Sequence, residues 1–547
     1  MLDSWKIPMS TRKRSFWKVI FLFVVATLFL KSFLRLGSVP QVEFLFTQTV
    51  PYNVFFDGME NYAIDAKSLK DNYKVDKADS LGIDQTTKLL TKDYLKEILN
   101  IDPQTLKKLK KSHHGYVNVH MEHLIKNVKI DTFGKQRKTH PSWRDYSKSK
   151  GYVIIGGGPY SWLSYLVVKQ IRATGSILPI EVFIPSQKEY EPEYCEEILP
   201  RYNARCIVLD PEIGALVLKV VKIGGYQFKM LAILQSSFEN VMYMDSDLFP
   251  VKNPEHLFTS QLFEEKGLFL WPDAWARTTN PYFHDIAEHP VIEKKVRYSD
   301  IDRKLANDQS LLPELLLYTF QNSNFHDFEG SLPDPTSEAG ILVVNKTSHK
   351  RTLLLALYYN LFGPKFYYPL LTQGSAGEGD KETFIAAATV MNETYFHTPK
   401  LFKWIGYESV DEGKFVSKSL GHYDPLTAKP EEESSLLFMH CSYPKYYTDW
   451  FYSNHDLVYK DEKTHIRMYE SVYENVGYDV DLRLLLAFVI GVCKNLNKDK
   501  ENDQWAGNFL SYIGKDVEVN NKRCEEVYIP HLEWLKETTK YKNTLLY

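Results

Sequence analysis

The sequence lacks an excess of basic charge, internal repeats and low-complexity tracts. Its 66 Lys and Arg residues are balanced by 69 Asp and Glu residues, and the formal net charge is −3 at pH 7. Without a positive field or a basic, aromatic-rich stripe, a role in nucleic-acid binding is excluded. The length of 547 residues predicts one large domain with appendages, or two domains, of ordinary globular composition.

Cysteine is scarce, with only five residues in the chain. Cys195 and Cys206 lie close in sequence and could form a disulfide, and Cys493 and Cys524 could form a second. Cys441 would then remain unpaired. This pattern agrees with an oxidising, lumenal compartment, although the pairing itself stays open.

Long hydrophobic runs are also rare, and the only one that could span a membrane covers residues 16–36. Its uninterrupted apolar part is shorter than the roughly 17–25 residues of a typical spanning helix, so we expect a short span of an early secretory membrane. More Lys and Arg residues precede it than follow it, which predicts a cytosolic tail at 1–15 and a lumenal remainder. The alternative, a cleaved signal peptide, lacks a small-x-small cleavage site.

Beyond this anchor the composition and hydrophobic pattern of the chain change twice. Residues 37–150 are polar and Lys-rich, and we interpret them as a stem and helical preface with two short helices around Asp102-Pro103. From Gly151 onward, apolar strands alternate with helical patterns, beginning with "GYVIIGGGPY" and a helix that Ser161 could cap. This alternation predicts βαβ units, a mostly parallel sheet flanked by helices and ligands at the carboxyl ends of the strands. We assign 151–455 to this α/β catalytic domain and 456–547 to a mainly helical extension of unassigned role.

The stretch "NVMYMDSDLFPVKNPEHLF" ends an apolar strand on two acids, Asp245 and Asp247. Residues two apart in an extended chain face the same way, and two carboxylates aimed at one point repel each other unless a cation lies between them. Oxygen ligands of this kind suit Mn²⁺ or Mg²⁺ bridging to substrate phosphates. The alternative is a solvated turn with an Asx-type cap.

Three consecutive glycines, Gly156 to Gly158, follow the first strand of the α/β region. They match neither the G-x-G-x-x-G pattern nor a P-loop, so dinucleotide and ATP binding are weakly supported. Two interpretations remain: a tight strand-to-helix turn, or a turn in which Gly157 approaches a bound nucleotide.

The motif with Asp245 and Asp247 resembles the metal-binding motif of nucleotide-sugar glycosyltransferases with a GT-A fold. Four further stretches resemble the fungal Golgi α-1,2-mannosyltransferases that build branches on cell-wall mannan: "GGGPYSWLSYLVVKQIRATGSILPIEVFIPS", "WPDAWARTTNP", "LLLALYYNLFGPKFYYPLLTQGSAGEGDKETFIAA" and "FMHCSYPKY". The resemblance runs from about Gly151 to Tyr446. It implies a type II Golgi membrane enzyme with a GT-A-like domain, GDP-mannose as donor, Mn²⁺ as metal, a mannose-containing glycan as acceptor and retention of the α configuration.

The resemblance also implies roles for individual residues. Asp245 and Asp247 would hold the metal and through it the diphosphate, with His440, which follows an apolar strand, as a third ligand. Lys229 and Lys445 would add positive charge at the diphosphate. A structural histidine and surface lysines are the competing interpretations of these three residues.

A second acidic cluster lies in "GSAGEGDKETF", where glycines flank Glu378 and Asp380. Glycine lets the backbone approach a substrate closely, so these acids are candidates to contact sugar hydroxyls or to stabilise the cationic transition state. Asp380 could instead cap the helix that follows. Retention by a covalent intermediate and by a front-face route both remain open.

Two further positions are expected near the sugars. Glu338 corresponds to a site that faces the substrate sugar in similar enzymes, although Ile341 stands where they often have a polar residue. Trp271, Asp273 and Trp275 could line an acceptor groove or pack in the core. Alternatives for the whole protein are an α-1,3-mannosyltransferase and a non-catalytic scaffold of a mannan-synthesising complex.

Overall fold

The structure is a computed structural model that describes residues 53–74, 76–83, 88–127, 148–298, 318–430, 432–496 and 504–542. All of these ranges belong to one compact unit, Tyr52–Tyr547. The predicted cytosolic tail and membrane anchor, residues 1–36, lie outside the described residues. Within the described ranges, no helix is long and apolar enough to cross a membrane.

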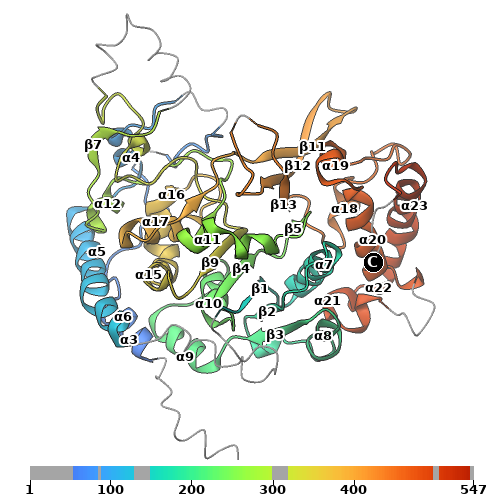
Figure 1. Cartoon of the computed structure of the whole chain (residues 1–547), viewed down its shortest axis with the longest axis horizontal. Coiled ribbons are helices and arrows are strands. Elements are labelled where there is room, and N and C mark those ends of the chain that lie inside the picture. The colour runs from blue at the N-terminus through green and yellow to red at the C-terminus, as the bar shows by residue number, and fades with distance from the viewer. Residues whose placement is uncertain are drawn as a thin grey trace, which may run out of the picture. The chain divides into compact units, whose positions relative to one another are not determined.

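A seven-stranded sheet forms the centre of the unit, in the order β10-β6-β9-β4-β1-β2-β3 (Figure 1). Its strands are β1 Lys150–Ile155, β2 Ile180–Ile184, β3 Ala204–Val208, β4 Asn240–Met244, β6 Leu268–Leu270, β9 Ile341–Asn345 and β10 Phe396–His397. Strand β1 pairs in parallel with β2 and β4, as does β2 with β3 and β10 with β6, whereas β9 runs antiparallel to β4 and β6. The prediction of an α/β fold with a mostly parallel sheet is confirmed, with β9 as the antiparallel exception.

The strands are mostly apolar because helices cover both faces of the sheet. Val182 and Ile184 of β2 belong to the hydrophobic core that contains α7 Pro159–Ala173. Phe183, which lies between them, contacts Phe228 of α10 Gln227–Gln235. Successive strand residues point to opposite faces, so α7 and α10 lie on opposite sides of the sheet. Helices α15 Lys350–Leu361 and α17 Lys381–Met391 pack together, and α10 packs on α15.

A second, antiparallel sheet was not expected from the sequence apart from one of its strands. Its order is β11-β12-β13-β5, with bounds β11 Lys403–Ser409, β12 Lys414–Tyr423, β13 Leu436–His440 and β5 Leu248–Pro250. Strand β5 begins directly after Asp247 and pairs with β13, where Leu248 lies opposite His440. The second sheet therefore brings His440 to the end of β4, almost 200 positions earlier in the chain.

The N-terminal preface packs against the α/β core. Two helices flank Asp102-Pro103 as predicted, α4 Lys92–Ile98 and α5 Pro103–Gly115, and the Asp102 side chain caps α5 by accepting from the backbone N–H groups of Gln104 and Thr105. Tyr116, just after α5, stacks on Tyr358 of α15 with a centroid distance of 4.3 Å. The segment continues into α6 Glu122–Asn127.

The C-terminal segment shares the hydrophobic core of the α/β part. Phe488 of α20 Val480–Val492 contacts Trp162 of α7 at a centroid distance of 5.9 Å. Helices α22 Val517–Arg523 and α23 Ile529–Thr538 complete this region. Both expected disulfides are present, Cys195–Cys206 and Cys493–Cys524, and Cys441 is free and buried. The boundaries at 150 and 455 stay predictions.

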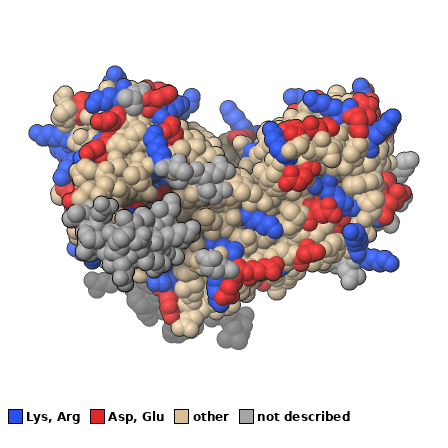
Figure 2. All heavy atoms as spheres, turned by 90° about the horizontal axis from the view of Figure 1, so that it is seen from above, with Lys and Arg blue, Asp and Glu red and all other residues tan. Residues whose placement is uncertain are grey.

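The shorter elements connect these layers. They are α3 Asn53–Asn61, α8 Leu199–Arg201, α9 Pro211–Val220, α11 Gln261–Lys266, α12 Tyr282–Ile286, α16 Tyr368–Thr372, α18 Trp450–Ser453, α19 Tyr473–Val476, α21 Ser511–Gly514, β7 Ile292–Lys295 and β8 Phe328–Glu329. On the face shown in Figure 2, acidic and basic side chains are interspersed, which agrees with the balanced composition.

Candidate active site

A cavity of about 1000 Å³ opens at the carboxyl ends of β1 and β4 and extends along the second sheet. Residues from both sheets and from the loops before α10 and α17 line it. Nine residues were predicted for the site, and all of them except Gly157 line the cavity. The eight that do so are Lys229, Asp245, Asp247, Glu338, Glu378, Asp380, His440 and Lys445. Parallel sheets bind ligands at this end of their strands.

Asp245 and Asp247 are held in place by backbone bonds to neighbouring strands. The Asp245 N–H donates to the carbonyl of Gly340 at 2.8 Å, and the Asp247 carbonyl accepts from the N–H of Cys441 at 2.9 Å. The Tyr243 hydroxyl donates to Oδ1 of Asp245 at 2.6 Å. Both carboxylates line the cavity, and Asp247 is buried. The alternative of a solvated turn therefore does not describe this pair.

His440 completes a group of three possible metal ligands. Its Nε2 atom lies 3.3 Å from Oδ1 of Asp247. One ligand atom from each of Asp245, Asp247 and His440 lies within 4.8 Å of the others. Two carboxylates and one imidazole form a mainly oxygen donor set that fits Mn²⁺ or Mg²⁺. These three residues are the ones that the sequence predicted as ligands.

Two lysines balance the negative charge. Nζ of Lys229 lies 2.9 Å from Oδ2 of Asp380 and 3.6 Å from Oδ1 of Asp245, and it donates to the carbonyl of Ala339 at 2.6 Å. Lys445 forms an ion pair with Oδ2 of Asp247 and is partly exposed. Lys229 is almost fully buried among its partners, so it fixes two carboxylates, whereas Lys445 faces the cavity.

The ionisation of the acids follows from these partners. Burial opposes charge on Asp247, yet His440 and Lys445 outweigh it and hold the pKa of Asp247 far below its usual value. Burial raises the pKa of Asp380, against the opposing effect of Lys229. Burial also opposes charge on Lys229, but Asp245 and Asp380 raise its pKa above the usual value.

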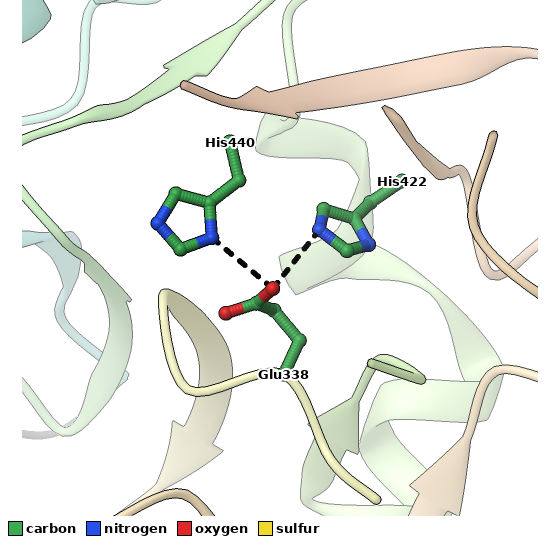
Figure 3. A group of neighbouring side chains, drawn as sticks. All are labelled: Glu338, His422 and His440. Carbon is green, nitrogen blue, oxygen red and sulfur yellow. Dashed lines mark ion pairs between the residues drawn. The ribbon is translucent and has the colours of Figure 1, made fainter. Parts of the chain in front are cut away.

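Glu338 turns its carboxylate toward two histidines (Figure 3). Its Oε2 atom lies 3.1 Å from Nδ1 of His440 and 3.3 Å from Nε2 of His422, while Oε1 accepts from the N–H of Gly340 at 2.6 Å. His440 therefore presents Nδ1 to Glu338 and Nε2 to Asp247. Metal-binding histidines commonly have such a carboxylate behind them, which fixes the ring and its tautomer.

This geometry changes the interpretation of Glu338, which was expected to face a sugar. It lines the cavity, but both of its carboxylate oxygens contact protein groups. His422, on β12, was missed because an isolated histidine in a half-polar strand gives no signal. The two histidines come together through the β12–β13 register, in which Gly421 lies opposite Met439.

The acids before α17 have different roles. Asp380 occupies the N-cap position of α17, but its side chain makes no capping hydrogen bond and pairs with Lys229 instead. Glu378 accepts from the Thr372 hydroxyl at 2.9 Å and from the N–H of Gly374 at 2.8 Å, and so closes its own loop. Of the two, Asp380 is the one that belongs to the charged network around Asp245.

The residues expected in the acceptor groove divide between core and cavity. Trp271 is fully buried, donates from Nε1 to the carbonyl of Tyr423 at 2.8 Å and packs on Phe438, so the core interpretation is correct for it. Asp273 and Trp275 line the cavity. Asp273 accepts from Nζ of Lys381 at 2.7 Å.

The glycine run forms the tight turn between β1 and α7. The N–H of Gly157 donates to Oγ of Ser161 at 2.9 Å, and its φ of +96° lies in the region that favours glycine. A Cβ there would come within 2.6 Å of the Glu189 carboxylate. Gly157 does not line the cavity, although Gly156 does, so the geometry favours the tight turn and the nucleotide contact of Gly157 stays a prediction. The expected cap at Ser161 is also wrong, because α7 begins at Pro159.

The chain is similar to known proteins along most of its length. The family model Mannosyl_trans3, for mannosyltransferases, matches residues 149–424, about half of the chain. The α-1,2-mannosyltransferase MNN2 of Candida albicans is 51% identical over 504 residues, which cover 89% of this chain and 84% of that protein. MNN21 of the same organism is 34% identical, covering 74% of this chain and 63% of that protein.

A more distant relative comes from Saccharomyces cerevisiae, whose α-1,2-mannosyltransferase MNN2 is 36% identical over 322 residues. That match covers 58% of this chain and 50% of the yeast protein. The family model thus covers the α/β core, and the similarity to the Candida protein extends along most of both chains. The chain therefore belongs to the fungal α-1,2-mannosyltransferase family and is an α-mannosyltransferase.

Proposed function

We propose that the protein transfers mannose from GDP-mannose to a mannose hydroxyl of a glycan chain, with formation of an α-1,2 linkage and with Mn²⁺ or another divalent cation at the site. The observation that carries this proposal is the convergence of Asp245, Asp247 and His440 in a cavity of about 1000 Å³. Membership of the mannosyltransferase family supports the sugar, and the 51% identical relative supports the linkage. A GT-A-like arrangement agrees with the mixed sheet and with the two acids after β4.

Cleavage of a glycosyl–phosphate bond places negative charge on the leaving diphosphate and positive charge on the sugar ring. A divalent cation held by Asp245, Asp247 and His440 would supply charge neutralisation and would orient the donor. Lys445 can add a second positive charge there, because its ammonium group faces the cavity beside Asp247.

The remaining residues hold the site in shape. Lys229 and Tyr243 fix the Asp245 carboxylate from behind. Glu338 directs Nε2 of His440 toward the ligand position. Asp380, which is buried beside Lys229 and lines the cavity, is positioned to contact the donor sugar or the charge that develops on its ring.

The location of the enzyme is part of the same proposal. A single-pass type II protein of the Golgi membrane, with residues 37–547 in the lumen, agrees with the charge distribution around residues 16–36. The two disulfides support an oxidising compartment, because such bonds are rare in the cytosol.

Product analysis tests the proposed reaction. Full-length protein in detergent is incubated with GDP-mannose, Mn²⁺ and defined oligomannosides, and the linkage and anomeric configuration of the product are determined. An α-1,2 product is expected. An α-1,3 product would overturn the linkage, and a folded protein that neither transfers nor hydrolyses GDP-mannose would favour the scaffold alternative. The Asp247→Ala variant is the inactive control.

A further inference from the structure

Three residues of the second sheet form one cross-strand row inside the cavity. Trp404 on β11 lies opposite Leu420 on β12, and Leu420 lies opposite His440 on β13. Directly opposed residues of antiparallel strands point to the same face of the sheet. All three residues line the cavity. Because neighbouring strands are about 4.8 Å apart, Trp404 lies roughly 10 Å from His440 along this wall.

The wall around Trp404 combines exposed rings with fixed polar groups. Trp404 is 37% exposed and Tyr443, three residues after His440, is 51% exposed. A β-bulge at Ile405/Gly406 interrupts the β11–β12 register beside Lys418. Nζ of Lys418 donates to Oδ1 of Asp456 at 2.6 Å and lies 5.1 Å from the centroid of the Tyr443 ring.

These features suit the ring of a sugar. A pyranose has a C–H face that packs on an aromatic ring and hydroxyl groups that require positioned donors and acceptors. Lys418 and the neighbouring Ser417, which both line the cavity, supply such polar groups beside Trp404. A nucleotide base would also pack on an aromatic ring, so the choice between a sugar and a base at Trp404 depends on where the nucleotide binds.

The topology favours the other end of the cavity as the position of the nucleotide. The chain runs from β1 to β2 and β3 on one side of the sheet and returns to β4 on the other, so the strand order reverses between β1 and β4. Nucleotides bind at such a switch point, at the carboxyl ends of the strands. Ile155, Pro185 and Glu189 line the cavity there. In Figure 1, β1, β2 and β3 lie below β4, whereas β11 and β12 lie above it.

We propose that Trp404, together with Lys418 and Tyr443, forms the subsite that binds the terminal mannose of the glycan acceptor. This inference rests on the proposed function, because it takes the donor diphosphate to lie at Asp245, Asp247 and His440. The acceptor sugar then lies between Trp404 and the metal ligands, where one of its hydroxyls can reach the donor sugar. Of the three residues expected in an acceptor groove, Trp271 lies in the core, whereas Asp273 and Trp275 line the same cavity as Trp404.

Kinetics of Trp404→Ala in the full-length protein test the subsite. We expect the KM for an oligomannoside acceptor to rise about tenfold, a factor that corresponds to ~1.4 kcal/mol. Acceptor-independent hydrolysis of GDP-mannose should stay within about twofold of wild type, since stacking on one ring contributes only to acceptor binding. Trp404→Phe should retain most of the acceptor affinity.

The matched control is Phe415→Ala, which removes another exposed ring from the same sheet. Phe415 lies on β12, is 43% exposed and does not line the cavity, so its loss should leave the acceptor KM unchanged. An unchanged acceptor KM in Trp404→Ala would overturn the proposal. A loss of GDP-mannose hydrolysis equal to the loss of transfer would also overturn it, by assigning Trp404 to the donor.

Direct binding separates the subsite from the proposed reaction. Saturation-transfer NMR with methyl α-mannoside should give a signal with wild type and with Phe415→Ala, and a signal at least about fivefold weaker with Trp404→Ala. If wild type fails to use GDP-mannose, the proposed function is wrong, and this contrast still decides the subsite. Equal signals from wild type and Trp404→Ala would contradict it.

Discussion

Two groups of buried acids differ in what holds them. At the end of β4, Asp247 is held by the side chains of Lys445 and His440. At the start of α20, Asp481 accepts from the backbone N–H groups of Met468 and Tyr469, at 2.9 and 3.0 Å, and from the Tyr473 hydroxyl. The first acid lines the cavity described above, and the second is not among the residues that line it.

The difference shows how a binding site can be told from a structural one. Backbone N–H groups are permanent partners that no ligand can replace without unfolding the segment. Side-chain cations at the edge of a cavity can give way to a metal ion or can pair with a substrate phosphate. Burial of a carboxylate is common to both regions, so the replaceable partner and the adjacent cavity are what indicate function.

The largest expected effect is the loss of Asp247. Asp247→Ala should lower the rate of mannose transfer about 100-fold to 1,000-fold, as is typical when a group that stabilises transition-state charge is removed. The free energy of unfolding should change by much less than the activation free energy of transfer, because Lys445 is partly exposed and can be solvated. Initial rates and urea denaturation measure the two effects. A rate near that of wild type would remove Asp247 from the mechanism.

The next effect concerns the residue behind His440. Glu338→Gln should weaken Mn²⁺ binding about 10-fold to 100-fold, because a neutral amide orients the imidazole less firmly. The Mn²⁺ concentration that gives half-maximal activity measures this, and saturating Mn²⁺ should restore much of kcat. A fall in kcat that Mn²⁺ does not restore would instead support the predicted contact between Glu338 and the sugar.

At α20 we expect a loss of stability without a loss of activity, the reverse of the result expected for Asp247. Asp481→Asn should lower the free energy of unfolding by about 1–2 kcal/mol, because the amide replaces one of the acceptor oxygens that the backbone N–H groups and Tyr473 use. The kcat of the folded fraction should not change. Thermal denaturation and active-site-normalised rates are the measurements. A selective loss of kcat would break the distinction between the two groups.

The last prediction concerns a dependence of stability on pH. Burial raises the pKa of Asp481 to about 7, with Tyr473 opposing this shift. Because the folded-state pKa exceeds the unfolded value of about 3.9, the folded protein binds more protons between these values, and stability falls as pH rises from about 4 to 7. Asp481→Asn should flatten this part of the profile of Tm against pH. An unchanged slope would mean that another group causes it.

The sequence predicted the part of the site at the end of β4 better than the cavity wall formed by β11 and β12. The apolar run before Asp245 and the strand before His440 are continuous, so both strands could be recognised. The pair Asp245 and Asp247 was predicted from its own spacing, whereas His440 was predicted as a ligand through the family resemblance. Strands β11 and β12 are largely polar, and Phe415 of β12 is exposed, so no apolar period marked them. Trp404 and His422 reach the site only through the register of that sheet, which residue spacing does not reveal.

Local hydrogen bonding distinguishes the observed surroundings of Gly157 and Glu378 from the ligand contacts that the sequence predicted for them. Gly157 belongs to a turn that Ser161 closes, and Glu378 closes its own loop. Each was a plausible ligand contact by residue type. Which partner such a group takes depends on neighbours that are distant in sequence or on a turn geometry that several sequences share.

Mn²⁺ dependence tests the central claim most directly. Full-length protein is treated with EDTA and titrated with Mn²⁺, and mannose transfer from GDP-mannose is measured alongside Mn²⁺ binding by calorimetry, for wild type and for His440→Ala. We predict that transfer is lost in EDTA and returns with Mn²⁺, and that His440→Ala binds Mn²⁺ at least about tenfold more weakly. Full transfer in EDTA, or unchanged Mn²⁺ binding in His440→Ala, would contradict a metal site formed by Asp245, Asp247 and His440.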